Sequence, residues 1–432
     1  MIESAPTSNP ANSATVPSGG SDVSDARAIA APLDRELRVR RLGPFLLIGQ
    51  AAWAIPGGVA NTLLAAVIAD LAPDHKVEIF TAYAVAGALT SAIGTVVGGL
   101  LSDRTRSRLG RRAPWLLGAS ILAAIALSAT AFTEQLFLIG VLFAIFQLGI
   151  GAYVAALAAL TPDHVAPGSV GRASAFGGFG YLLGQTVGGV VAGTFVTNPH
   201  VGLLISPWVM VLGAVAIVLF VRGRDSRSGI APARSIRLTD LVPHGSRDFW
   251  LAFLGRFLFI LAILMVITFE LYVLTDYLHL TTANAGKVIS LGTLLIGLLS
   301  AIGVIVSGVL SDRTHRIKPF VIVTPLILAV GLVPLLVAPG LVTVFIFFGA
   351  IGLTLGAYLA VDQALMVAVL PDATTAARDI GFLSIGSTLP AVVAPIVGGL
   401  VAATLGYVAV FVIALILAIA AAAVIFGIRS VR

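Results

Sequence analysis

The chain has no cysteine and few charged residues. Its 432 residues include no Cys, and Asp, Glu, Lys and Arg together account for only 11%. The missing cysteine excludes disulfides, thiolate metal sites and a cysteine nucleophile. Soluble proteins are about one quarter charged, and a fold that is 58% hydrophobic cannot hide all of its apolar surface from water. The composition excludes a soluble enzyme, a disordered protein and a secreted disulfide scaffold, and it predicts a polytopic membrane protein.

Histidine is also scarce, and the sequence lacks the residue clusters of a membrane-embedded enzyme. The six histidines all fall in hydrophilic breaks, at His75, His164, His200, His244, His279 and His315. No cluster of His, Asp and Glu lies near a predicted interface, so we expect no enzyme, no metal and no cofactor. The longest internal hydrophilic stretch, 223–247, is too short to form the soluble domain of a receptor.

Long apolar stretches dominate what is present. Each is long enough to cross the roughly 30 Å hydrocarbon core of a bilayer, and only helices satisfy their backbones there at this hydropathy. The twelve stretches run at 43–70, 77–102, 113–132, 136–160, 171–196, 202–222, 248–275, 284–310, 319–337, 341–370, 378–404 and 406–428. The sequence therefore predicts an all-α integral membrane protein with twelve transmembrane helices.

The positive charge is concentrated on one side of these spans. Nearly all of the 26 Lys and Arg residues lie in the N-terminal tail, in alternate connections between spans, and at the C-terminus. The positive-inside rule then places both termini in the cytoplasm of a cell whose plasma (inner) membrane holds the protein. The net charge of +6 is a topology signal, and we expect no nucleic-acid partner.

Two hydrophilic segments divide the chain. Residues 1–42 are rich in Ser, Pro, Ala and Asn, and such a composition predicts a disordered cytoplasmic tail. Residues 223–247 form a predicted cytoplasmic linker between an N-terminal six-helix bundle, 43–222, and a C-terminal bundle, 248–432.

The two bundles repeat each other. The segment Gly99-x-Leu-Ser-Asp-Arg-Thr105 recurs as Gly308-x-Leu-Ser-Asp-Arg-Thr314, and Pro162-Asp163 recurs at the same offset as Pro371-Asp372. Six spans that return to the same side make a parallel repeat, related by an axis along the membrane normal. Such an architecture gives two pseudo-symmetric bundles with a substrate cavity between them.

The first copy of this loop resembles a known family. Residues 98–112, GGLLSDRTRSRLGRR, resemble the loop signature of the major facilitator superfamily, and that resemblance covers all twelve spans. The extended form through Pro114, together with Leu370-Pro371-Asp372 and Arg378-Asp379, resembles the glycoside–pentoside–hexuronide and disaccharide–proton symporters. The resemblance implies a secondary active transporter that works by alternating access.

The repeated loops are predicted to gate the cytoplasmic side. A carboxylate at a helix end is stabilised by the positive N-terminus of another helix, and the resemblance implies that Asp103 meets the helix starting near Arg378. The repeat places Asp312 near Gly171 in the same way. The alternative is that these loops only set topology. The candidate gating residues, with Arg104 expected to pair with Asp163 and Arg313 with Asp372, are Asp103, Arg104, Asp163, Asp312, Arg313 and Asp372.

A candidate substrate-binding surface lies on the first span. Gln50, Trp53 and Asn61 share one helical face, and amides beside an aromatic ring suit a sugar, whose hydroxyls need hydrogen bonds and whose C–H face stacks on a ring. The alternatives are interhelical hydrogen bonds and an interfacial tryptophan. The full candidate set is Gln50, Trp53, Asn61, Gln147, Tyr181 and Gln185. Drug–proton antiporters of the superfamily carry proline where this chain has Gln185, which disfavours drug efflux.

Three charged residues lie inside spans, and we assign them to proton coupling: Arg256, Glu270 and Asp362. Buried ionisable groups in lipid are costly unless they are paired or face water. We expect Arg256 and Asp362 to lie at one level and to form an ion pair that opens when Asp362 takes up a proton. Alternatively, Arg256 snorkels to the cytoplasmic edge and Glu270 meets water at the outer edge.

The predicted function is proton-coupled symport of a sugar or glycoside by a monomer in contact with membrane lipid. Sodium-coupled carriers of the melibiose type use acidic residues within the first two spans, and neither span interior holds one here. A proton is therefore the expected coupling ion. Proton-coupled efflux of amphipathic compounds and transport of lysolipids are the alternatives.

Overall fold

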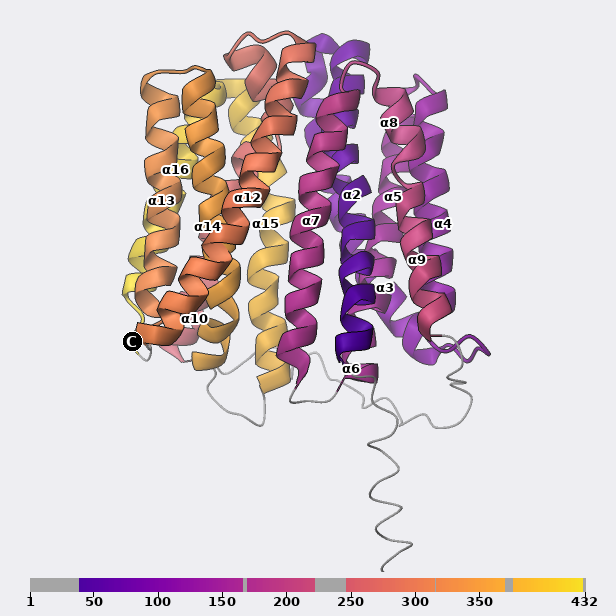
Figure 1. The fold of residues 1–432 in the computed structure, drawn as a ribbon. Helices are drawn as coiled ribbons and strands as arrows, with labels where there is room; N and C mark the ends of the chain where they lie inside the picture. Colours follow the sequence, from indigo (N-terminus) through magenta and orange to yellow (C-terminus); the bar gives the residue numbers. More distant parts are fainter. Residues whose placement is uncertain (1–38, 166–168, 222–245, 315, 370–375, 430–432) are drawn as a thin grey trace, which may run out of the picture.

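The structure, a computed structural model, describes residues 39–165, 169–221, 246–314, 316–369 and 376–429. Within these ranges the chain is helical and contains no β-strand. The helices stand side by side as two groups, as Figure 1 shows. We call residues 39–221 the N-terminal half and residues 246–429 the C-terminal half.

The N-terminal half contains six spans. Its helices are α2 (Val39–Leu71), α3 (Lys76–Arg104), α4 (Ala113–Ala129), α5 (Leu136–Ala158), the short α6 (Leu160–His164), α7 (Val170–Phe195), α8 (Pro199–Ile205) and α9 (Trp208–Val221). The sixth span is divided into α8 and α9 at Pro207, since proline removes a backbone donor. The first helix begins at Val39, so the end of the predicted tail is helical.

The C-terminal half repeats this order. Its helices are α10 (Arg247–Ile267), α11 (Glu270–Tyr272), a π-helical turn (Val273–Tyr277), α12 (Thr282–Thr314), α13 (Lys318–Val337), α14 (Leu341–Ala368), α15 (Ala376–Leu405) and α16 (Tyr407–Phe426). The predicted seventh span therefore consists of α10, α11 and the π-helical turn. The expected tail and linker lie mostly outside the described residues.

The predicted fold class is confirmed. Among the described residues, 11 helices are long and apolar enough to cross a membrane by length and composition. The remaining predicted span is α7, whose many glycines and the polar Gln185 and Thr186 lower its hydropathy. Its sides are instead covered by α2 in its own half and by α12 in the other half.

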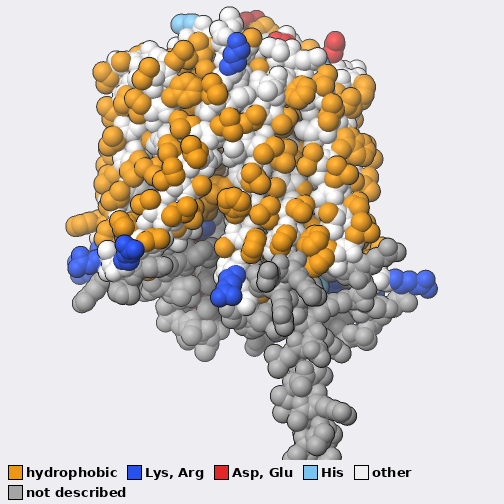
Figure 2. All heavy atoms as spheres, viewed as in Figure 1, with side chains coloured by type: hydrophobic (Ala, Val, Ile, Leu, Met, Phe, Trp, Pro, Cys, Tyr) orange, Lys and Arg blue, Asp and Glu red, His pale blue; other side chains and the backbone are white. Residues whose placement is uncertain are grey.

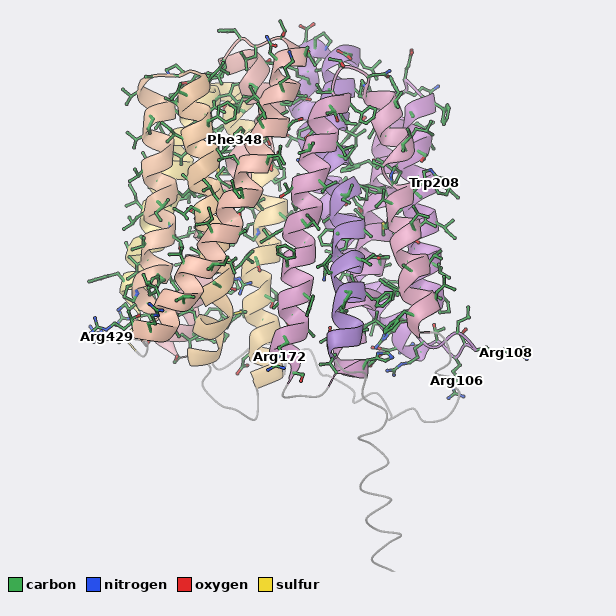
Figure 3. All side chains as sticks on the ribbon, viewed as in Figure 1. Arg106, Arg108, Arg172, Trp208, Phe348 and Arg429 are labelled. Atoms are coloured by element: carbon green, nitrogen blue, oxygen red, sulfur yellow. The ribbon has the colours of Figure 1, made fainter. Side chains whose placement is uncertain are left out.

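The surface has an apolar belt and two unlike ends. Side chains such as Leu298, Ile305 and Val330 are more than half exposed within the belt, where a bilayer rather than water suits them. Figure 2 shows most of the visible Lys and Arg at one end of the belt and the visible Asp and Glu at the other. Figure 3 labels Arg106, Arg172 and Arg429 at this first end. We call it the arginine-rich end, and we call the opposite one the far end.

The two halves meet along two helix pairs, α7 with α12 and α3 with α15. Small residues let α7 and α12 approach closely: Gly193 lies against Gly286 and Ser290, and the Ser290 hydroxyl donates to the Val190 carbonyl at 3.1 Å. Figure 1 shows these two helices meeting at the top and separating toward the bottom. These two helices are thus in closest contact at the far end.

Candidate functional site

An ion pair inside the C-terminal half is the best-defined charged site. Arg256 on α10 lies with its Nη1 3.0 Å from Oδ2 of Asp362 on α14, and the two side chains are only 13% and 6% exposed. The predicted ion pair is therefore present. Arg256 does not snorkel to the arginine-rich end, because its guanidinium is held among three helices.

Two further contacts fix the Arg256 guanidinium. Its Nε donates to the Ser387 hydroxyl of α15 at 3.1 Å, and its Nη1 donates to the Met366 sulfur of α14 at 2.6 Å. Tyr358 lies one turn before Asp362 and packs its ring on Phe259, with 4.7 Å between centroids. Removing one member of a buried pair costs about 3–5 kcal/mol because the other charge is stranded. Arg256 and Asp362 are thus held as one unit.

The N-terminal half carries an uncharged polar cluster instead. Trp53 donates its indole N–H to Oε1 of Gln50 at 2.6 Å, and its ring lies 5.5 Å from the ring of Tyr181 on α7. The Tyr181 hydroxyl is hydrogen-bonded to Gln185, one turn further along α7. Four of the six predicted substrate-binding residues therefore lie together, and we call Gln50, Trp53, Tyr181 and Gln185 the amide–aromatic cluster.

A cavity opens beside this cluster. It has a volume of about 400 Å³ and lies among α2, α5, α6 and α7 toward the arginine-rich end. Its walls include Gln50, Thr161, Ser174 and Gly177. Polar groups on a cavity wall are available to a solute that enters from that end.

The other two predicted binding residues lie apart from the contacts of the cluster. Gln147 on α5 packs against α3, where an added Cβ on Gly87 would stand 3.1 Å from its Cγ. Asn61 is half-buried on α2 beyond Trp53. Both remain candidates for the cavity lining, and the contacts described here join neither one to Trp53.

The charged loop at the arginine-rich end pairs differently from the prediction. Arg112 is almost fully buried, and its guanidinium contacts Asp103 at 2.6 Å and Asp163 at 3.0 Å. Arg111 contacts the other carboxylate oxygen of Asp163 at 2.8 Å. The expected Arg104–Asp163 pair is therefore wrong for this state. The reason is the turn at Gly110, whose φ of 93° suits glycine, and which returns Arg111 and Arg112 to Asp163.

The rest of the predicted gate is only partly described. Asp103 pairs with Arg112 of its own half and is 59% exposed, and Arg104 and Arg313 are exposed. Asp372 and the side chain of Asp312 lie outside the described residues. The contacts of Asp103 and Asp163 described here lie within the N-terminal half.

Charges at the far end do join the halves. Lys76 of α3 lies 2.7 Å from Oδ1 of Asp276 in the π-helical turn, and the Tyr407 hydroxyl donates to Oδ2 of the same carboxylate at 3.1 Å. Tyr272 donates to the Ala65 carbonyl of α2 at 2.9 Å. We call Lys76, Tyr272, Asp276 and Tyr407 the far-end lock.

The far-end lock was missed by the sequence analysis. Lys76 and Asp276 stand at the ends of apolar stretches, where charges are ordinary boundary residues. The topology places the start of the second span and the end of the seventh at the same side of the membrane. That shared side is the signal that could have suggested a pair. Which residues face each other across the halves depends on helix rotation, which the sequence pattern does not supply.

An aromatic layer lies beneath the lock. Phe80 of α3 packs on Phe269 and Tyr272 of the other half, with ring centroids 5.9 and 5.7 Å apart. Toward the arginine-rich end, by contrast, α7 and α12 diverge (Figure 1). The halves are therefore in contact at the far end, and these two helices separate toward the arginine-rich end.

Glu270 lies in neither of these two sites. Its Oε1 is buried and has no hydrogen-bond partner among the described residues. The surrounding side chains are apolar and include Leu335 of α13 and Phe347 and Phe348 of α14. The alternative that Glu270 meets water at the outer edge does not hold for Oε1, while the residue as a whole is half-buried.

The comparisons with known proteins agree with this architecture. A family model described as the Major Facilitator Superfamily matches residues 79–327 and 288–432. The chain belongs to the major facilitator superfamily. It is thus a multi-pass membrane transporter and not an enzyme, with a fold that serves secondary active transport. None of the curated proteins compared with the sequence matches it.

Solved structures share the fold at low sequence identity. A bacterial homologue of the human lysosomal transporter Spinster, inward-facing and occupied, is 13% identical with a TM-score of 0.68, covering 89% of this chain and 95% of that one. A POT family transporter in complex with 5-aminolevulinic acid is 14% identical with a TM-score of 0.70, again covering 89% and 95%. At this identity the likeness concerns the fold alone.

Proposed function

We propose that this transporter imports a neutral polar solute, a sugar or glycoside, together with a proton. In this proposal the arginine-rich end faces the cytoplasm, since positively charged loops are retained there. The state described above is then closed to the outside and separated toward the cytoplasm, as after import. Both termini are cytoplasmic in the same orientation.

The amide–aromatic cluster is the observation that carries the choice of a sugar. The Trp53 ring offers an apolar face for the C–H side of a sugar, and Tyr181 adds a second ring beside it. Gln50 and Gln185 offer amide donors and acceptors for hydroxyls, and Gln50 reaches the 400 Å³ cavity. An amphipathic drug would need fewer such groups, so the cluster favours import of a sugar over efflux.

The charge balance supports a neutral solute and a proton. Arg256 and Asp362 neutralise each other, so the site presents no net charge to a substrate. A proton on Asp362 would release Arg256 and break the pair, because a neutral carboxyl no longer attracts the guanidinium. If the ion pair forms in one state of the transport cycle and is broken in the other, each cycle would carry one proton across the membrane.

Ligand binding by purified protein tests this proposal. A thermal-shift screen against disaccharides, monosaccharides, nucleosides and lysolipids should show stabilisation by a sugar, because a ligand that binds only the folded state stabilises it by mass action. Trp53→Ala should weaken that binding by about tenfold or more. Trp208→Ala, which alters an exposed tryptophan on α9 (Figure 3), is the matched control. Stabilisation by lysolipids alone would overturn the sugar assignment.

A further inference from the structure

Glu270 occupies an apolar pocket of the C-terminal half. The pocket is lined from α10 by Val266 and Ile267, and from the other helices by Leu335, Val344 and Phe348. Figure 3 shows Phe348 toward the far end of this half. The empty space beside the carboxyl is about 10 Å³, at the lower limit for one water molecule. Oε1 of that carboxyl therefore has neither solvent nor a hydrogen-bond partner among the described residues, although Glu270 as a whole is half-buried.

The titratable groups that follow Glu270 in the same segment have other partners. The Tyr277 hydroxyl donates to the Leu335 carbonyl at 3.2 Å, and the Tyr272 hydroxyl donates to Ala65 of the other half. The Asp276 carboxylate forms an ion pair with Lys76 and accepts a hydrogen bond from Tyr407. No charged side chain lines the pocket from α10, α13 or α14. An ionised carboxylate is costly among apolar side chains, so these surroundings favour the neutral carboxylic acid.

The same short segment carries Glu270 and half of the far-end lock. The α-helix stops at Ile267, restarts for one turn as α11, and widens into the π-helical turn Val273–Tyr277. Tyr272 and Asp276 of the lock lie in this segment. Single π-turns inside helices recur at functional sites and let a segment change its winding. A shift that frees Glu270 from its pocket therefore also moves Tyr272 and Asp276.

We propose that Glu270 is a second proton-binding site, loaded from the far side of the membrane when the far-end lock opens. When the lock is open, water reaches the carboxylate and it takes up an external proton. The resulting neutral acid enters the apolar pocket. The segment from α11 to the π-helical turn then returns to the conformation described above, and the far-end lock closes. This inference rests on the transporter fold and on the proposed orientation, and it does not depend on the solute being a sugar.

Distances across the far end test the proposal. The native chain has no cysteine, so Thr133→Cys and Gly340→Cys, in far-end loops of the two halves, accept one spin label each. Without substrate, alkaline pH should populate a longer label-to-label distance and acidic pH the short one, with the ratio of populations changing about tenfold. In Glu270→Gln, and in Glu270→Met, whose side chain suits the pocket, the short distance should prevail at both pH values.

One control separates Glu270 from other titrating groups. Glu78→Gln alters an exposed carboxylate at the same end and should keep the full pH response. A parent protein without any pH response, or Glu270 variants that respond as the parent does, would overturn the proposal. Failure of the sugar screen would leave these distances unaffected.

Discussion

The two ends of the molecule use charge in different ways. At the far end, Lys76 and Asp276 belong to different halves and hold them together. At the arginine-rich end, Arg112 binds Asp103 and Asp163 of its own half. Charged residues at one end of the molecule therefore do not by themselves hold the two halves together. An ion pair joins the halves only where it has one member in each half.

The two halves differ in the same instructive way. They share a repeated helix order and repeated loops, yet the N-terminal half holds the neutral amide–aromatic cluster and the C-terminal half holds the Arg256–Asp362 pair. The repeat determines the helix arrangement of each half. The side chains of the two sites lie at positions that do not correspond to each other in the repeat. In our proposal one half recognises the solute and the other binds protons.

The largest effect is expected from Asp362→Asn, which removes the proton acceptor that we propose. Proton-driven accumulation in proteoliposomes should be abolished, whereas exchange of solute across the membrane should persist. The double variant Arg256→Gln with Asp362→Asn controls for the stranded guanidinium, whose unpaired burial costs about 3–5 kcal/mol. Full uphill transport by Asp362→Asn would show that coupling lies elsewhere.

Arg112→Ala should be the most damaging change at the arginine-rich end. It removes one of the two arginine partners of Asp163 and the bond to the Ser102 hydroxyl, so we expect a loss of about 1–3 kcal/mol in the free energy of unfolding. This loss is measured by recording the decrease in helicity as a denaturing detergent unfolds the protein. Arg108→Ala alters an exposed arginine of the same loop and should change stability by about 0.5 kcal/mol or less. Equal effects of the two substitutions would refute the buried role of Arg112.

Reversing the far-end ion pair should affect state populations rather than stability. Lys76→Asp places two carboxylates together, and the population closed at the far end should fall about tenfold. Adding Asp276→Lys should restore it, because the attraction is re-formed with opposite polarity. Spin-label distances across the far end measure both variants. A double variant as open as the single one would mean that the glycine contacts alone hold this end.

The smallest effect in this state is expected from Asp103→Ala. Its carboxylate is 59% exposed, and exposed ion pairs contribute at most about 1 kcal/mol. If Asp103 gates the arginine-rich end in the alternate state, the variant should disfavour that state modestly, and an introduced cysteine near Gly178 should react faster from that end. Unchanged reactivity in Asp103→Ala and Asp312→Ala would leave both loops as topology signals.

The sequence predicts depth along the membrane well and rotation about helix axes poorly. Twelve spans, the repeat and the common level of Arg256 and Asp362 follow from counting residues along helices. The Arg104–Asp163 prediction failed because a loop turn at Gly110, rather than helix spacing, decides which arginine returns to Asp163. The pairing of Lys76 with Asp276 depends on a π-helical turn that the residue pattern does not predict. Tertiary contacts determine both pairings.

A reversible cross-link at the far end tests most directly whether the two halves must separate there. An added Cβ on Gly399 of α15 would contact the side chain of Thr81 of α3, so Thr81→Cys with Gly399→Cys should form a disulfide under oxidation. Solute uptake into proteoliposomes should stop on oxidation and return on reduction. Each single-cysteine variant should be insensitive to the same treatment. Uptake that continues with the cross-link fully formed would contradict alternating closure of the far end.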